Sequence, residues 1–271
     1  MSDAAKPGGP RLPAAFLSHG SPTSALEKDQ FAEALARLGS ELPKPKAVIA
    51  VADTWRTPGA VRVTAAARHV NLRKFNGAPP ALSGLAYQPT GDPDLARRIV
   101  DLLKGAGFDS FPDQVRSLDP GTWIPLSMAY PEADVPVVQV SLPTDAEPAQ
   151  LLAIGAALGG LRDEGILLMA GGGAGDGLDL RRLERKHAPV EPWAIEFDDW
   201  VEARLAALDR EALADFRASA PHAEEAVPGS LPIDPLLVVI GSTGKDEAVT
   251  TVYEGVHHGK LSMRSFTVGE A

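Results

Sequence analysis

Residues 14–22, Ala-Ala-Phe-Leu-Ser-His-Gly-Ser-Pro, form the stretch that decides the fold. An apolar run that is closed by Gly and Pro predicts a buried strand leading into a tight turn. The strand would end at Ser18 and place His19 at its carboxyl end, where open α/β sheets bind their ligands. A single histidine after a strand is also compatible with a hydrogen-bonded turn residue that has no further role. Both interpretations of His19 stay open at this point.

The rest of the chain alternates between apolar strands and helices. Continuous or alternating apolar runs predict strands at 47–52, 61–64, 135–141, 166–170, 235–241 and 261–268, the last of them at a sheet edge. Apolar periodicity predicts helices at 26–39, from Asp92 onward, at 148–161 and at 192–208. Residues 68–91 show no periodicity and are predicted to form a long loop. The alternation predicts an α/β fold: a single domain with a central, mostly parallel or mixed sheet that helices cover on both faces.

Composition excludes several classes of function. The chain has 271 residues and a formal net charge of −10, which disfavours binding to nucleic acid. It contains no cysteine, so disulfides and thiolate metal sites are excluded, and no apolar run is long enough to span a membrane. Residues 1–11 lack the apolar core of a secretory signal and are predicted to be a disordered tail before a domain at 12–271. The expected location is the cytoplasm.

Polar residues follow four of the predicted strands. They are Ser18-His19, Asp53-Thr54, the glycine turn at 171–177 with Asp176, and Gly241-Ser242. If these strand ends meet at one edge of the sheet, their side chains form one pocket. The glycine turn has neither the Walker spacing nor a Gly-x-Gly-x-x-Gly fingerprint, so close backbone packing is favoured over a phosphate site.

Several motifs resemble those of the class III extradiol, DODA-type (LigB-like) aromatic ring-opening dioxygenases. They are Ser-His-Gly-Ser-Pro at 18–22, Ala-Tyr-Gln-Pro-Thr-Gly at 86–91, Asp-Pro-Gly-Thr-Trp at 119–123, Asp-Pro-Leu-Leu at 234–237 and Gly-Lys-Leu-Ser-Met-Arg-Ser at 259–265. The resemblance runs in order from about residue 12 to near the end of the chain. It implies the LigB-like extradiol dioxygenase fold over 12–271.

The resemblance also implies a divalent ion, iron or zinc, that histidines from separate strand ends hold, with a further histidine as acid or base. Those positions fall on His19, Thr54, Pro120, Asp176 and Pro232, so only His19 is retained. One imidazole cannot hold an ion that keeps open positions for a diol and oxygen, and proline offers no side-chain donor. The expectation is therefore that no metal cofactor is bound.

A rebuilt metal site is the alternative to that expectation. It would hold Fe²⁺, Zn²⁺ or Mn²⁺ with His19, Asp53, Asp176 and Asp234. The plainer interpretation of the aspartates is that they are turn and cap residues at strand ends. Two other histidines, His69 and His187, are predicted to be surface or loop residues.

The resemblance, with its altered ligand positions, predicts a divergent family member that binds a small aromatic or carboxylate ligand. His19 with Asp176 or Asp53 would carry out metal-free acid/base chemistry, or the chain would have no catalytic activity. The predicted substrate-binding residues are Ser18, Asp53, Thr54, Trp55, Trp123 and Ser242. Two alternatives stay open, an active ring-opening dioxygenase with a rebuilt site and a non-catalytic partner subunit of an oxygenase. Neither nucleic acid nor membrane is expected as a partner, whereas a homo-oligomer or a hetero-oligomer with a homologous subunit is possible.

Overall fold

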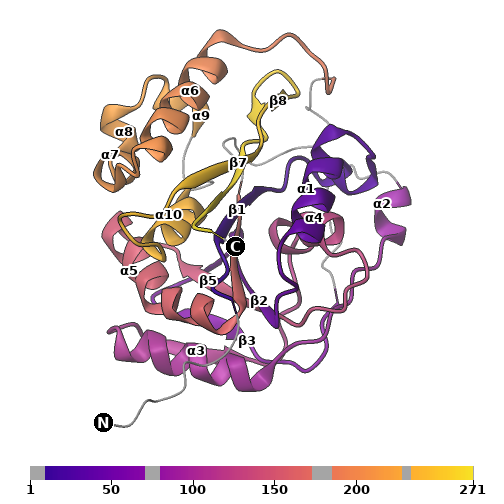
Figure 1. The fold of residues 1–271 in the computed structure, drawn as a ribbon, viewed down its shortest axis with the longest axis vertical. Coiled ribbons are helices and arrows are strands. Elements are labelled where there is room, and N and C mark those ends of the chain that lie inside the picture. The colour runs from indigo at the N-terminus through magenta and orange to yellow at the C-terminus, as the bar shows by residue number, and fades with distance from the viewer. Residues whose placement is uncertain (1–9, 71–79, 173–184, 228–232, 271) are drawn as a thin grey trace.

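The computed structural model describes residues 10–70, 80–172, 185–227 and 233–270. Its centre is an eight-stranded sheet with the strand order β4-β3-β5-β2-β6-β1-β10-β7 (Figure 1). The strands are β1 (Ala14–Ser18), β2 (Ala47–Thr57), β3 (Val61–Thr64), β4 (Ser110–Asp113), β5 (Val137–Pro143), β6 (Ile166–Gly172), β7 (Val249–Tyr253) and β10 (Ser265–Val268). A separate two-stranded hairpin consists of β8 (Val256–His257) and β9 (Leu261–Ser262).

The middle of the sheet is parallel and buried on both faces. Strands β5, β2, β6 and β1 pair in parallel, while β10 pairs antiparallel with β1 and β7. Successive residues of β2 alternate between two cores, since Ile49 and Val51 belong to one cluster and Val48 and Ala50 to the other. A continuous apolar run is therefore what such a strand requires, because water reaches neither of its faces. The predicted α/β fold with a mixed central sheet is confirmed.

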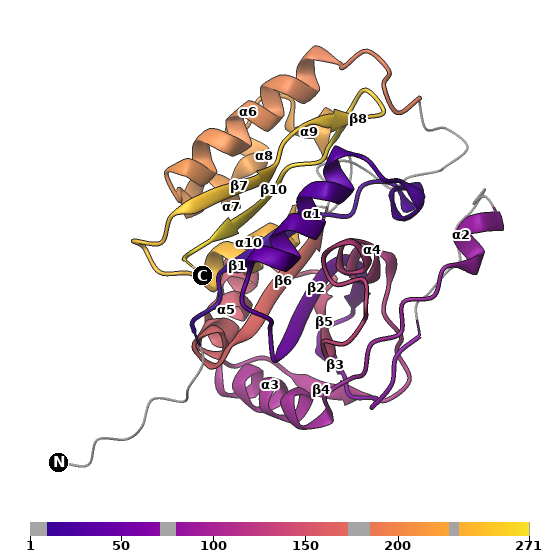
Figure 2. The same cartoon turned by 45° about the vertical axis from the view of Figure 1, so that its right-hand side comes forward.

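Helices form one layer on each side of the sheet (Figures 1 and 2). One face packs against α3 (Pro93–Gly105), α5 (Pro148–Gly159), α6 (Pro192–Ala206) and α10 (Asp234–Gly241), and the other against α4 (Pro120–Ala129), which α1 (Gln30–Glu41) covers. The short helices are η1 (Pro22–Leu26), α2 (Pro80–Gly84), η2 (Gly160–Glu164), α7 (Arg210–Ala214), α8 (Phe216–Ser219) and α9 (Ala223–Ala226). Within the described ranges, no helix is long and apolar enough to cross a membrane.

Two sequence predictions about the C-terminal part are wrong. Residues 235–241 form helix α10 rather than a strand. The helix is buried on all sides, so it carries the same continuous apolar run as a buried strand, and periodicity cannot separate the two. Residues 261–268 divide into β9 and β10, and β10 lies inside the sheet because β7, which was not predicted, occupies the edge.

The predicted start of the helix at Asp92 is confirmed, whereas two segments predicted to lack helices contain them. Asp92 caps α3 by accepting hydrogen bonds from the backbone of Asp94 and Leu95, and Pro93 begins the helix. The predicted loop 68–91 contains α2, and the motif at 119–123, which the sequence suggests is a turn, is the start of α4, with Asp119 as its N-cap. Most of the predicted tail, residues 1–9, lies outside the described residues, and Leu12 is already buried.

Arg162 joins the N-terminal and C-terminal strands at the amino edge of the parallel sheet. This side chain in η2 is fully buried and donates five hydrogen bonds. Its acceptors are the carbonyl oxygens of Leu12, Ser242 and Val268 and both carboxylate oxygens of Glu247. Because a guanidinium group has five N–H donors, Arg162 has no donor left over.

Candidate functional site

The carboxyl end of β1 turns sharply and presents His19. The hydroxyl of Ser18 bonds to the carbonyl oxygen of Ser262 at 3.4 Å and accepts a hydrogen bond from the backbone of Gly20 at 3.3 Å. Gly20 has φ +58°, a conformation that glycine adopts without steric cost. Its carbonyl oxygen lies 2.8 Å from His19 Nδ1. The turn therefore fixes the imidazole ring through backbone contacts, and Ser18 acts as a structural part of that turn.

A large bulge in β2 presents Asp53 and Thr54 beside this turn. The partners of Val51 and Arg56 on β5 are Val140 and Leu142, so five residue steps on β2 match two on β5. Three extra residues are accommodated between these two pairings, and the ladder is broken there. Such a bulge frees the side chains from the alternation of a flat strand, which places Asp53 next to His19.

His19 and Asp53 form the central pair of the candidate site. His19 Nε2 lies 3.5 Å from Asp53 Oδ1, and the two side chains are 13% and 17% exposed. Both atoms are buried and face each other at the long end of hydrogen-bonding range, and in the described part of the chain neither has another hydrogen-bond partner. Burial lowers the pKa of His19, but the charge of Asp53 and its contact with the ring, the bond to Gly20 and the charge of Asp119 outweigh it, so the net shift is upward. Unsatisfied buried polar atoms are costly, which indicates that a bound molecule completes them.

Asp119 supports this pair from the N-terminus of α4. Its carboxylate accepts hydrogen bonds from the backbone of Thr122 and from the side chains of Gln139 and Thr54. Burial raises the pKa of Asp119, the bonds from Gln139 and Thr54 oppose the shift, and the charge of Asp53 adds to it. All its described contacts hold it in place as a helix cap.

The start of α4 lies directly against the bulge. A Cβ atom added to Gly121 would lie 2.8 Å from Ala52 Cβ and 3.5 Å from Asp53 Oδ1. A Cβ atom added to Gly171, at the end of β6, would lie 1.8 Å from the carbonyl oxygen of Gly121. Both positions require glycine because backbones approach each other closely there. Gly171 therefore lies in β6 rather than in the predicted turn, and close packing accounts for it; residues 173–177 with Asp176 lie outside the described residues, so the interpretation of the turn itself stays a prediction.

Asp234 is tied to an arginine that the sequence analysis did not single out. Arg56 Nη1 donates to Asp234 Oδ2 at 2.8 Å, and Arg56 Nε donates to the carbonyl oxygen of Asp53 at 3.2 Å. Burial raises the pKa of Asp234, while Arg56 opposes that shift. Arg56 thus connects the start of α10 to the bulge and occupies the Asp234 carboxylate. Its position three residues after Asp53 was the signal that could have indicated it.

These donors do not fit the divalent ion that the family resemblance implies. His19 Nε2 and Asp53 Oδ1 are available, but Asp119 and Asp234 already accept bonds from other residues, and Pro120 has no donor. The described residues contain no group of three His, Asp or Glu side chains that could hold a metal. Zinc sites in proteins use three or four protein ligands. Asp176 and Pro232 lie outside the described ranges.

Not all residues predicted to bind substrate lie near this pair. Trp55 lies within the bulge and is buried, and Trp123 of α4 is buried in the core between that helix and the sheet. Ser242 caps the C-terminal end of α10 and its carbonyl oxygen accepts a bond from Arg162, so it lies at the amino edge of the sheet. The misassigned strand explains this difference, because a strand ending at Gly241 would have brought Ser242 to the carboxyl edge. His69 is buried rather than on the surface, and bonds to the carbonyl oxygen of Val137 at 2.9 Å.

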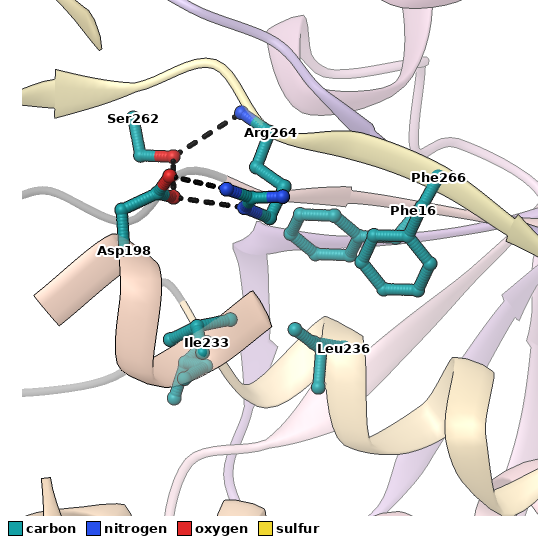
Figure 3. A pocket seen from close by; sticks show the side chains of 8 residues that line it. Phe16, Asp198, Ile233, Leu236, Ser262, Arg264 and Phe266 are labelled. Atoms are coloured by element: carbon teal, nitrogen blue, oxygen red, sulfur yellow. Dashed lines mark hydrogen bonds and ion pairs between the residues drawn. The ribbon is translucent and has the colours of Figure 1, made fainter. Parts of the chain in front are cut away.

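A small cavity lies on the α6 and α10 side of β1 and β10 (Figure 3). It has about 20 Å³ of space and lies beside the buried pair of Asp198 and Arg264. Arg264 donates to both carboxylate oxygens of Asp198, and Ser262 donates to one of them. A cavity of this volume holds about one water molecule. The polar groups around it satisfy one another, so it is not the ligand site.

The sequence and the structure of this chain are similar to those of known proteins. Residues 13–266 match the family model described as the catalytic LigB subunit of aromatic ring-opening dioxygenase. The 4,5-DOPA dioxygenase extradiol of Escherichia coli K12 is 34% identical over 96% of this chain and 95% of its own length. The protein of the same name from Beta vulgaris is 32% identical over 93% of this chain and 94% of its own length. A crystal structure of an uncharacterized E. coli K12 protein superposes with a TM-score of 0.78 at 31% identity, covering 96% of this chain and all of that one.

Proposed function

Because this chain belongs to the LigB family of aromatic ring-opening dioxygenases, we propose that it uses the family's strand-end pocket for acid–base chemistry on a small aromatic or carboxylate ligand. The observation that carries the proposal is the buried pair of His19 Nε2 and Asp53 Oδ1, 3.5 Å apart, which among the described residues have no hydrogen-bond partner besides each other. A ligand that bonds to both would complete the hydrogen bonding of each.

The contact with Gly20 determines which nitrogen of His19 can act. A carbonyl oxygen only accepts hydrogen bonds, so Nδ1 must carry the proton in its 2.8 Å contact with the Gly20 oxygen. The lone pair of the neutral ring is then on Nε2, which can take a proton from a ligand. When Nε2 is protonated, the nearby Asp53 carboxylate stabilises the imidazolium. The pair can therefore act first as a base and then return the proton as an acid.

Ring opening with oxygen would require more than these residues supply. The reaction needs a redox-active ion with open positions for both the diol and oxygen. The described donors available to an ion are one imidazole and one carboxylate. The proposed chemistry is therefore a proton transfer within the family's fold.

A rebuilt metal site is the second candidate, and one observation favours it. Two ligands of a tetrahedral ion with bonds of about 2.0–2.2 Å lie about 3.4 Å apart, close to the 3.5 Å between His19 Nε2 and Asp53 Oδ1. Asp176 would have to supply the third ligand. Metal content separates the two candidates.

The first experiment measures metal content and oxygen uptake. The purified protein is incubated with Fe²⁺, Zn²⁺ or Mn²⁺ and desalted, and oxygen uptake is then recorded with catechol and DOPA. We expect no stoichiometric metal and no uptake. About one equivalent of metal that is lost in His19→Ala but kept in His222→Ala would establish the rebuilt site instead. His222 is a matched control because it also faces a carboxylate, Glu196, at the protein surface.

The second experiment tests proton abstraction. Phenylpyruvate combines an aromatic ring, a carboxylate and an acidic carbon-bound proton, whose exchange in D₂O can be followed by NMR. We expect the wild-type chain to accelerate the exchange and His19→Gln to lose about 10²–10⁴-fold of that rate. His222→Ala should exchange like the wild type. Equal rates in wild type and His19→Gln, or no acceleration by either, would contradict the acid–base proposal.

A further inference from the structure

Arg116 is a cation at this site whose guanidinium donates no hydrogen bond to the residues that the structure describes. Its Nη2 lies 3.7 Å from Asp119 Oδ2, which is ion-pair range but longer than a hydrogen bond. Its Nε is buried and has no partner in the described part of the chain. Asp119 in turn contacts Thr54, and its charge acts on His19, so Arg116 belongs to the same edge of the sheet.

The other arginine at this edge is fully engaged by comparison. Arg56 donates from Nε to the Asp53 carbonyl oxygen and from Nη1 to Asp234. Elsewhere, Arg204 and Arg210 also have an unpartnered Nε, but their other guanidinium nitrogens donate hydrogen bonds to Asp209 and to Thr243. The Arg116 guanidinium differs from these three because none of its nitrogens donates a hydrogen bond to a described residue.

The guanidinium of Arg116 is nevertheless held in a defined orientation. It lies over the ring of Trp55, with 5.3 Å between its central carbon and the ring centroid. The loop that carries it is fixed by Asp113, whose carboxylate accepts the backbone N–H groups of Val115 and Arg116. Stacking on an aromatic ring fixes the plane of a guanidinium while leaving its edge free to donate. The Arg116 side chain is 29% exposed, so its guanidinium is partly open to solvent although Nε is buried.

We infer that Arg116 anchors the ligand through a carboxylate that accepts hydrogen bonds from its Nε and Nη edge. This inference rests on the proposed function and deepens it, because it selects carboxylates from the two ligand classes considered. A planar carboxylate matches the fork of a guanidinium, and such bonds are stronger than those between neutral groups. Asp119 Oδ2 lies 3.7 Å from Nη2 and already accepts a hydrogen bond from Gln139, so this ion pair leaves the hydrogen-bonding capacity of Nε open. The aromatic or apolar body of the ligand then extends toward the His19–Asp53 pair.

Binding of benzoate and of its neutral analogue benzamide to the full-length chain tests the inference. We expect benzoate to bind more tightly than benzamide by isothermal titration calorimetry. Arg116→Met should weaken benzoate binding at least about tenfold and leave benzamide binding unchanged. Arg116→Lys, which keeps the charge but loses the fork, should be intermediate. Arg62→Met is the matched control, because Arg62 lies over the ring of Phe111 at 5.1 Å in the same kind of stack. It should bind benzoate like the wild type.

Three outcomes would overturn the inference: equal benzoate affinity in wild type and Arg116→Met, equal affinity of the wild type for benzoate and benzamide, or no benzoate binding by the wild type. The phenylpyruvate exchange reaction separates this failure from failure of the proposed function. If both hold, Arg116→Met raises KM and leaves kcat near its wild-type value, whereas His19→Gln lowers kcat. If benzoate binding depends on Arg116 but no exchange occurs, the anchor stands and the acid–base proposal fails.

Discussion

Each edge of the parallel sheet carries a buried group of charged side chains, and the two groups differ in how many of their polar atoms are hydrogen-bonded. At the amino edge, all five donors of Arg162 are bonded to carbonyl oxygens and to Glu247. At the carboxyl edge, Arg116 Nε is buried with no hydrogen-bond partner in the described ranges, and His19 Nε2 and Asp53 Oδ1 face only each other there, at 3.5 Å. Helix α10 connects the edges, with Asp234 at its start and Ser242 at its end. A buried network whose polar groups are all hydrogen-bonded stabilises the fold. Buried polar groups that lack hydrogen bonds need another explanation, and a bound ligand is one.

The largest effect should follow from removing the satisfied network. We expect Arg162→Met to lower the free energy of unfolding by about 3–5 kcal/mol, because it leaves buried acceptors without donors. Urea denaturation measures this loss, and any residual folded protein should still bind benzoate. Arg98→Met is the control, since Arg98 pairs with Glu164 at the surface and such a pair contributes about 0–1 kcal/mol. A loss for Arg162→Met as small as the control would end the distinction between the two edges.

The next largest effect concerns packing, and not charge, at the carboxyl edge of the sheet. Gly121→Ala places a Cβ atom 2.8 Å from Ala52 Cβ. Because this distance is too short, α4 or β2 has to shift. We expect a loss of stability of about 1–3 kcal/mol, measured by thermal unfolding. Gly105→Ala in α3 meets nothing within 4 Å and should instead stabilise the chain by about 0.5–1 kcal/mol. Equal effects at both positions would show that α4 does not press on the bulge.

Asp53→Asn should have a smaller effect that depends on pH. The pKa of His19 is raised in the folded chain, so the pair contributes stability that is fully present below the ordinary histidine pKa. That stability is lost as the pH rises through the pKa of the folded state. We expect Asp53→Asn to be less stable than the wild type at about pH 5 and to approach it in alkaline solution. A stability difference that does not change with pH would contradict the coupling of His19 to Asp53.

The smallest effect concerns Asp119. Its pKa is raised by burial, so the folded chain favours the protonated carboxyl, and the stability that this proton confers is lost as the pH rises through the folded-state pKa. Asparagine can still cap α4. We therefore expect the stability of Asp119→Asn relative to the wild type to increase between about pH 4 and about pH 7. Denaturant titrations at several pH values measure the trend, and the opposite slope would mean that Asp119 is a stabilising anion.

The sequence predicted the sheet better than it predicted the charges. The apolar runs of β1, β2, β5 and β6 were sufficient for the parallel core, because strands buried on both faces need such runs. The same signal failed for α10, since a fully buried helix has the same composition as a buried strand. Asp53 was identified from its position after an apolar run. The bulge that aims it at His19 was not, because a change of strand register leaves no local trace in the sequence.

Arg162, Arg56 and Arg116 were all missed for a related reason. Each is a single arginine in a polar segment. The roles of Arg162 and Arg56 depend on partners that are distant in the chain, and the role of Arg116 depends on a donor that has no described partner. Arg162 bonds to residues up to 150 positions before it and 106 after it. The unused donor of Arg116 is a property of the assembled site alone. Long-range satisfaction of polar groups therefore has to be measured on a structure.

The left-handed backbone of Gly20 decides more than the shape of a turn. Its φ of +58° aims the carbonyl oxygen back at His19 Nδ1. A Cβ atom at this position would meet Ser24 Oγ at 2.6 Å and Met263 Cε at 2.7 Å. A chiral amino acid here would favour another backbone conformation and would press on Ser24 and Met263, and if the oxygen turned away, the ring proton would be free to move to the other nitrogen. The absence of a side chain at Gly20 thus helps to determine which nitrogen of the His19 ring is a Brønsted base.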